Sequence, residues 1–308
     1  MAVEDGASMV RRPPVTPTAE IEIERSVVTP RQLGQFLRAA NPGYQSGAAP
    51  QTTAPLSFAL ALRRSQGPHV AIAPEAFAIH GGHDLELHHP IRVGGEYSVR
   101  GRVDEIFEKT GRSGPLTVIA RRVRIIDAEG TPAVIIRDRQ IVRWRPSARG
   151  ADSLAAEHPH GSPGGSEIPS TPPLAVNPEL GVGSIIGPIE RRAPSAGNIS
   201  SWAGALRDRE VLFHDEAESN KLGYRGLVVP GPMQSAFIDD MLRSKLPAWT
   251  LTALSMTFRQ SLIAGDGISI HAVVIEADDT RRVCDIAVES RETGETASAG
   301  VAELHLRK

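Results

Sequence analysis

The sequence predicts an α+β protein made of two domains, each an antiparallel sheet covered by one main helix. At 308 residues and 40% hydrophobic content, the chain is longer than one ordinary core requires. A stretch rich in Pro, Gly and Ser at 146–178 has the composition of a linker. The segments on its two sides repeat one order of helical and strand-like patterns. We therefore expect a flexible arm at 1–20, a first domain at 21–145 and a second domain at 179–308.

The first domain shows one helical pattern followed by a series of strand patterns. An apolar run that starts at a proline predicts a helix over 55–64, because proline is favoured in the first helical turn. Residues 87–99 close one strand, turn on the pair Gly94-Gly95 and open the next strand. Alternating residues continue through 118–126, and a last strand is expected at 133–142.

The second domain repeats this plan. A longer apolar run behind a proline predicts a helix over 232–246. Residues 258–270 again close a strand, turn at Asp266-Gly267 and open the next strand, and 299–304 form the last strand. Antiparallel sheets bury one face, so each apolar helix is the natural cover of its own sheet.

Composition excludes several classes of function. Lysine plus arginine (34) nearly balance aspartate plus glutamate (36), so no net field recruits nucleic acid or an anionic membrane. The single cysteine, Cys284, cannot form an intramolecular disulfide and fits a reducing compartment. No apolar run has the length of a membrane-spanning helix, and the N-terminus is not signal-like. These features indicate a soluble, cytoplasmic protein.

Four histidines gather in a short stretch, at His80, His83, His88 and His89. We expect no metal there, because no helical i, i+4 pair is present and the adjacent pair should face opposite sides of a strand. Contact of His80 or His83 with a binding tunnel is one alternative, and solvated strand-end side chains are the other. Since no dinucleotide fingerprint or phosphate loop occurs, we expect no cofactor.

The segments most informative about chemistry are 202–215 and 223–233 in the second domain. They resemble the signature of MaoC-like hydratases, in which an Asp, then Asn-Pro-Ile/Leu two residues later, then a His, precede a glycine-bounded entry to a central helix. The resemblance extends over both halves and implies a tandem double hotdog of the FAS1-type dehydratase kind. It also implies an acyl thioester substrate, carried on coenzyme A or an acyl carrier protein, in a tunnel where the halves meet.

The resemblance assigns roles residue by residue. Asp208 stands at the position of the catalytic aspartate, and Gly231 stands where a backbone amide would hold the thioester oxygen. A helix N-terminus suits that task, because its amides are unpaired and negative charge develops on this oxygen. The substrate tunnel is expected to include the residues Trp202, Phe213, Tyr224, Pro230, Met233 and Phe237.

The motif departs from the family in the residues that would transfer protons. Glu210 replaces the asparagine and Phe213 replaces the histidine, and a phenylalanine cannot carry a proton. His214 is one candidate substitute, one residue further along the chain. Glu210 is the other, because two carboxylates in an apolar pocket can divide into an acid and a base. The remaining alternative is that these charged residues form a solvated loop with a helix cap.

The first half keeps the family's Asn41-Pro42 but has Ala39 where the acid belongs. We therefore predict a non-catalytic first domain that forms a wall of the tunnel.

Three functions stay open from the sequence. The first is hydration or dehydration of an enoyl or 3-hydroxyacyl thioester, which makes the protein a hydro-lyase. The second is a tunnel repurposed as a cyclase of the Diels-Alder type in polyketide biosynthesis, which needs shape more than proton transfer. The third is a non-catalytic binding subunit of a heteromeric dehydratase. A homodimer and a pairing with another hotdog subunit are both open.

Overall fold

The computed structural model describes residues 18–41, 51–63, 68, 70–73, 76–111, 114–144, 180–206, 208 and 210–307. The expected linker at 146–178 lies outside these residues, as does most of the expected N-terminal arm.

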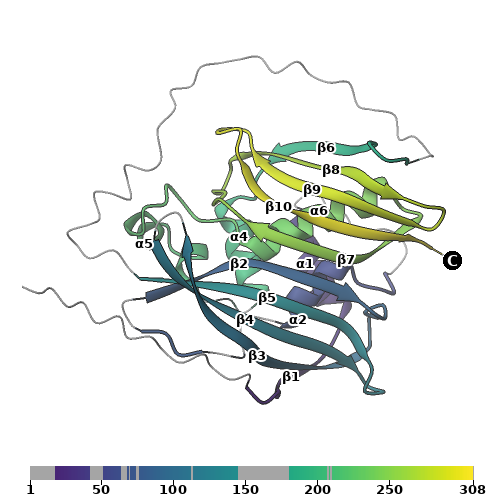
Figure 1. Ribbon diagram of the computed structural model, residues 1–308, viewed down its shortest axis with the longest axis horizontal. Helices are drawn as coiled ribbons and strands as arrows, with labels where there is room; N and C mark the ends of the chain where they lie inside the picture. The colour runs from purple at the N-terminus through teal and green to yellow at the C-terminus, as the bar shows by residue number, and fades with distance from the viewer. Residues whose placement is uncertain are drawn as a thin grey trace, which may run out of the picture.

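One antiparallel sheet of ten strands forms the framework (Figure 1). The strand order is β1-β3-β4-β5-β2-β7-β10-β9-β8-β6, so the five strands before residue 146 lie together and the five after residue 179 follow them. The two groups meet where β2 pairs with β7, through residues 82–86 and 253–257. The first group comprises β1 (Ile21–Val27), β2 (Ala76–Leu87), β3 (Glu96–Gly111), β4 (Gly114–Asp127) and β5 (Pro132–Trp144). The second comprises β6 (Ile185–Arg192), β7 (Trp249–Phe258), β8 (Gly267–Ala277), β9 (Arg281–Ser290) and β10 (Thr296–Leu306).

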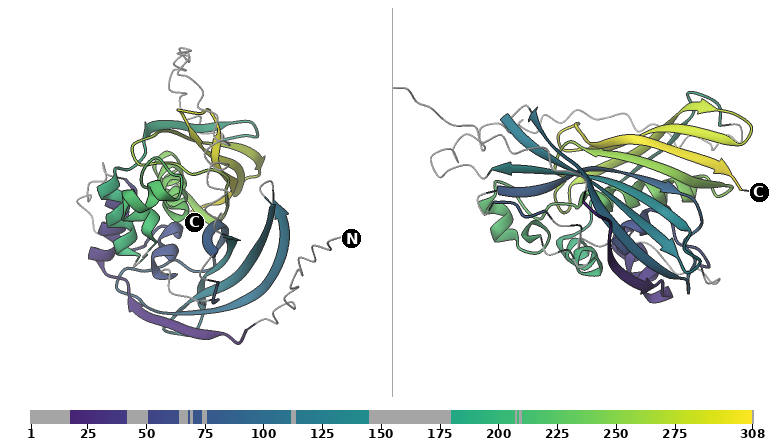
Figure 2. Two further views of the ribbon diagram at one scale, coloured as in Figure 1. Left: turned by 90° about the vertical axis from the view of Figure 1, so that its left-hand side faces the viewer. Right: turned by 60° about the horizontal axis from the view of Figure 1, so that its bottom comes forward.

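The helices lie on the inner face of the curved sheet (Figure 2). The longest is α6, which begins at the glycine before a proline and has most of its residues buried. Its bounds agree with the helix predicted at 232–246 to within one residue. The helix predicted at 55–64 forms as a 3₁₀ turn followed by a short α-helix. The helical elements are α1 (Pro30–Ala40), η1 (Leu56–Phe58), α2 (Ala59–Arg63), α4 (Ala196–Ala205), η2 (Val211–Phe213), α5 (Glu216–Lys221) and α6 (Gly231–Lys245).

The core joins the two halves of the chain. Phe36 of α1 packs against Trp202 of α4, with ring centroids 4.6 Å apart, and meets the Phe58 ring edge to face at 5.3 Å. All three rings are almost completely buried and belong to one continuous hydrophobic cluster. The antiparallel α+β architecture predicted from the sequence is confirmed. None of the described helices is both long and apolar enough to cross a membrane.

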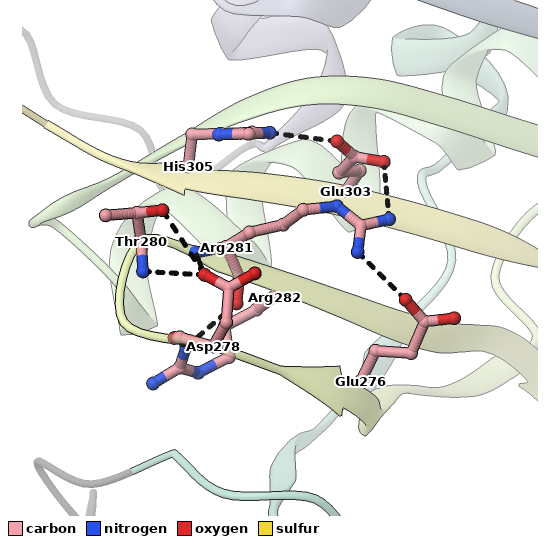
Figure 3. Close-up of polar contacts among 7 residues, drawn as sticks. All are labelled: Glu276, Asp278, Thr280, Arg281, Arg282, Glu303 and His305. Atoms are coloured by element: carbon pink, nitrogen blue, oxygen red, sulfur yellow. Dashed lines mark hydrogen bonds and ion pairs between the residues drawn. The ribbon is translucent and has the colours of Figure 1, made fainter.

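A network of ion pairs crosses the outer face of the second group of strands (Figure 3). Arg281 of β9 reaches Glu276 of β8 at 2.8 Å and Glu303 of β10 at 3.1 Å, and Glu303 also pairs with His305 at 2.8 Å. Residues between them, such as Leu304, point into the core, as the period of two in a strand requires. Exposed pairs of this kind contribute little to stability, so they reinforce the strand register without determining the fold.

Asp239, on α6, stabilises a helical turn of the other half. Its buried carboxylate accepts the Ser57 amide hydrogen at 2.7 Å, which caps the start of η1. We expect Asp239→Ala to lower the free energy of unfolding by about 1–3 kcal/mol, because a buried donor loses its partner. Urea denaturation measures this, and Asp279→Ala in the exposed turn between β8 and β9 is the matched control. Equal stability of the two variants would show that this cap is unimportant.

Candidate active site

A pocket of about 270 Å³ opens between the two halves of the chain, beside the first turn of α6. Its walls come from β2, β4 and β5 on one side. On the other side they come from the segment between α4 and α6 and from the end of β7. Polar side chains contribute nearly half of its surface, so the pocket is not simply an apolar tunnel. The polar and charged lining residues include Arg63, His80, Arg121, Gln140, Asp208, Glu210, Tyr224, Gln234 and Gln260.

Two carboxyl groups lie on the side formed by the second half. Asp208 is half-buried, and burial raises the pKa of its carboxyl above the ordinary value. Glu210 lies at the rim, and its pKa is also raised, through partial burial and the nearby charge of Asp208. The Asp208 carboxylate accepts the Glu210 amide hydrogen at 3.1 Å, which holds the turn between them. Both carboxyl groups are therefore protonated more readily than they would be in water.

Gly231 begins α6 and lines the pocket next to this pair. A Cβ atom at this position would lie 2.6 Å from the Phe258 ring, so only glycine lets that ring pack against the helix start. In the first turn of α6, Pro232 has no N–H and the Met233 amide donates to the Pro230 carbonyl at 3.0 Å. The Gly231 amide, at the first position of the helix, is therefore the one suited to hold an oxygen on which negative charge develops.

A chain of three polar groups leads from the pocket to α6. His80 lines the pocket and its Nε2 lies 3.1 Å from Nδ1 of His83, whose Nε2 lies 2.8 Å from the Ser235 hydroxyl. Burial lowers the pKa of His80 well below its ordinary value and that of His83 to about 3, so both rings are neutral near pH 7.

A bulge in β2 makes this contact possible. Strand side chains three residues apart normally face opposite sides. The register of β2 against β5 shifts between His80 and Gly82, so the extra residue returns both histidines to the same face. The contact of His80 with the pocket was one of the alternatives considered for this stretch.

Arg63, Asp138 and Arg121 form a buried triad in the pocket wall of the first half. Arg121 and Asp138 are direct neighbours across β4 and β5, and Arg121 Nε donates to the carboxylate at 2.7 Å. Arg63 of α2 donates to the other oxygen of the same carboxylate. Burial alone would raise the pKa of Asp138, but the two guanidinium groups hold it well below its ordinary value. The sequence carried no local signal for this triad.

Comparison with known proteins agrees with this architecture. Residues 16–136 match the family model for the FAS1-like dehydratase domain region. This match covers less than half of the chain, within the segment before residue 146. No curated protein matches.

Solved structures with a similar fold, one of them described as a double hotdog, align over nearly the whole chain. A MaoC-like dehydratase is 16% identical, with a TM-score of 0.70 over 94% of this chain and 97% of the other. Peroxisomal multifunctional enzyme type 2 from Drosophila melanogaster is 16% identical, with a TM-score of 0.64 over 94% of this chain and 48% of the other. A conserved protein of Mycobacterium tuberculosis, described as a double hotdog, is 12% identical, with a TM-score of 0.58 over 94% of this chain and 95% of the other.

Six of the residues that the sequence predicted for the site line the pocket: Asp208, Glu210, Phe213, Tyr224, Pro230 and Gly231. His214 is not among the residues that line it. Its ring lies outside and donates from Nε2 to the backbone carbonyl of Asp208 at 2.7 Å, so it supports the loop and does not substitute for the missing histidine. This corrects the expectation for His214.

The expectation that three large apolar side chains line the tunnel was also wrong. Trp202, Met233 and Phe237 are each at most 1% exposed and belong to the hydrophobic core. Met233 and Phe237 are one helical turn apart, so they share the α6 face that points into the core. The pocket instead contacts Pro232 and Gln234 on the same helix. Within the described residues, no group of three His, Cys, Asp or Glu side chains could hold a metal ion.

Proposed function

We propose that the protein is an acyl-thioester hydratase or dehydratase, which adds water to an enoyl thioester or removes it from a 3-hydroxyacyl thioester. The observation that carries the proposal is the pair Asp208 and Glu210 beside the start of α6 in one pocket. The acyl group enters this pocket, while its carrier, coenzyme A or an acyl carrier protein, stays outside.

In the proposed reaction, the Asp208 carboxylate takes a proton from water as the oxygen attacks the β-carbon. The electrons move onto the thioester oxygen, where the Gly231 amide stabilises the enolate. Protonated Glu210 then delivers a proton to the α-carbon, and dehydration runs the same steps backward. The two carboxyl groups thus replace the aspartate and histidine of the family, and no redox step is involved.

We further propose that the chain is a tandem double hotdog, with domains at 21–145 and 179–308. The division of the sheet into five strands before and five strands after the linker supports this. The β2·β7 pairing then supplies within one chain the contact that joins two hotdogs, so the protein does not depend on a second hotdog subunit. A homodimer of such units remains compatible with this arrangement.

The rate should depend on pH in a bell-shaped manner. Hydration requires ionised Asp208, so kcat/KM falls as the pH drops through the pKa of this group. Because that pKa is raised, the acid limb should lie above the ordinary aspartate value of about 3.9. The alkaline limb reports loss of the Glu210 proton, at a pKa above its ordinary value. Glu210→Gln should remove the alkaline limb and keep the acid limb, whereas retention of both limbs would exclude Glu210 as the acid.

Mass spectrometry tests the function directly. The purified protein is incubated with crotonyl, 3-hydroxyacyl and longer polyunsaturated thioesters of coenzyme A. A gain or loss of one water by wild-type protein, absent without protein, is the expected result. No mass change in the whole panel would refute the proposal, and an isobaric product with a new retention time would favour the cyclase alternative.

A further inference from the structure

The triad of Arg63, Asp138 and Arg121 has no role in the proposed proton transfers, yet it lies in the wall of the same pocket. Arg63 and Arg121 are 6% and 8% exposed and Asp138 is 1% exposed. Buried charges are rare unless they are paired, because leaving water costs each ion several kcal/mol.

The charges of the triad do not balance. Two guanidinium groups share a single carboxylate, and Asp138 stays ionised between them. Both ion pairs found for Arg63 and Arg121 in the described part of the chain involve Asp138, so one positive charge is left over. Nε of Arg63 is also buried and has no hydrogen-bond partner among the described residues. A buried donor without an acceptor is destabilising, so this guanidinium group is not fully satisfied by Asp138.

No further ion pair among the described residues neutralises this charge, and Arg259, which also lines the pocket, adds another positive charge. His80, on the same wall, is neutral, and Gln140 beside it is uncharged. Asp208 lies in the same pocket and is close enough for Arg63 to influence its titration, but no ion pair joins the two. The wall therefore presents a positive charge with free donors to whatever enters the pocket.

We propose that this wall is a subsite for a carboxylate, and that the preferred substrate is a short acyl thioester whose far end carries a carboxylate, such as a half-thioester of a dicarboxylic acid. The inference rests on the proposed function for the thioester end. A planar carboxylate matches the paired donors of a guanidinium group. The triad lies inside the pocket, whereas the phosphates of a carrier remain outside, so a carboxylate is favoured over phosphate.

The selectivity test compares two thioesters of coenzyme A that differ only in this group: crotonyl and 3-carboxyacryloyl, in which a carboxylate replaces the methyl group. We expect wild-type protein to hydrate the carboxylated substrate with a kcat/KM at least about tenfold higher, as one charge-assisted bidentate contact provides. Arg63→Met should remove this preference, measured as the ratio of kcat/KM for the two thioesters in the same variant, so that any effect common to both rates cancels. This substitution leaves Asp138 paired with Arg121, so no buried charge is stranded.

Two further variants guard against an effect on folding alone. Arg63→Lys keeps the charge without the planar donor pair, so it should retain a reduced preference. Arg122→Met is the matched control, because Arg122 neighbours Arg121 on β4 but is 38% exposed and pairs with Asp104 at 2.9 Å. It should leave the preference unchanged.

Calorimetry with free succinate, butyrate and inorganic phosphate gives a readout that needs no catalysis. Binding of succinate by wild type, lost in Arg63→Met and absent for butyrate, supports the subsite even if no thioester is hydrated, in which case only the proposed function fails. Equal rates for both thioesters together with no succinate binding overturn the subsite and leave the hydratase proposal intact. Phosphate binding as tight as succinate would instead assign the wall to a carrier phosphate.

Discussion

Replacing Asp208 with asparagine is expected to lower kcat for hydration by about 10²–10⁴-fold, the usual effect of losing a general base. Asparagine has nearly the same shape as aspartate. Its side-chain oxygen can still accept the Glu210 amide hydrogen, which Asp208 accepts at 3.1 Å in the wild-type protein. The turn should therefore persist while the proton acceptor is lost. KM should change little, because shape and polarity at the pocket wall are preserved. Steady-state rates on the best thioester of the panel measure both constants.

Asp215→Asn is the matched control for this variant. Asp215 belongs to the same segment, but its carboxylate caps α5 by accepting the Glu218 amide hydrogen at 3.0 Å, and it does not line the pocket. Its rate should stay within about threefold of wild type, since asparagine is an equally good helix cap. If Asp208→Asn behaves like this control, the Asp208 carboxylate is not the general base, and hydration depends on another group.

The sequence predicted those parts of the fold that depend on local periodicity. The turns at Gly94-Gly95 and Asp266-Gly267 separate β2 from β3 and β7 from β8, as expected from glycine at a turn beside alternating strands. The helix at 232–246 was equally accessible, because a proline and a long apolar run are local signals. The family motif then located Asp208 and Gly231, since both lie in one continuous segment around the start of α6.

The other half of the site depends on contacts that no local pattern encodes. Arg121 and Asp138 come together through the register of β4 against β5, and Arg63 reaches them from a helix in a distant part of the chain. Charged residues in strands are ordinarily exposed to solvent, so no local pattern indicated the burial observed for Arg121 and Asp138. His80 and His83 share a face only because of the bulge in β2.

The motif also did not indicate which nearby apolar residues line the pocket and which belong to the hydrophobic core. Trp202, Met233 and Phe237 lie close in sequence to residues that line the pocket, and apolar side chains suit either environment. Only the packing of α4 and α6 against the other elements decides between them. Sequence position near a catalytic motif is therefore a weak guide to which large apolar residues contact substrate.

Truncating Trp202 should have the largest effect on stability. Its ring is 1% exposed and packs on Phe36 of α1 with centroids 4.6 Å apart, so Trp202→Ala opens a cavity between two helices from different halves of the chain. We expect the free energy of unfolding to fall by about 3–5 kcal/mol, measured by urea denaturation. Trp249→Ala is the control, because that ring is only half-buried and contacts the Arg282 guanidinium at 4.7 Å, so its loss should cost less.

The number of transitions in the Trp202→Ala unfolding curve reports how strongly the two halves of the chain are coupled. The Trp202 contact and the β2·β7 pairing both join the two halves, so they should unfold in one transition that the substitution shifts as a whole. If the curve instead splits into two transitions, the aromatic contact supplies most of the coupling between the two halves and the sheet pairing supplies little.

The variant Trp202→Phe tests the ring and the indole N–H separately, because phenylalanine keeps an aromatic ring but has no N–H group. The indole nitrogen is buried and has no hydrogen-bond partner among the described residues, so phenylalanine should recover most of the lost stability.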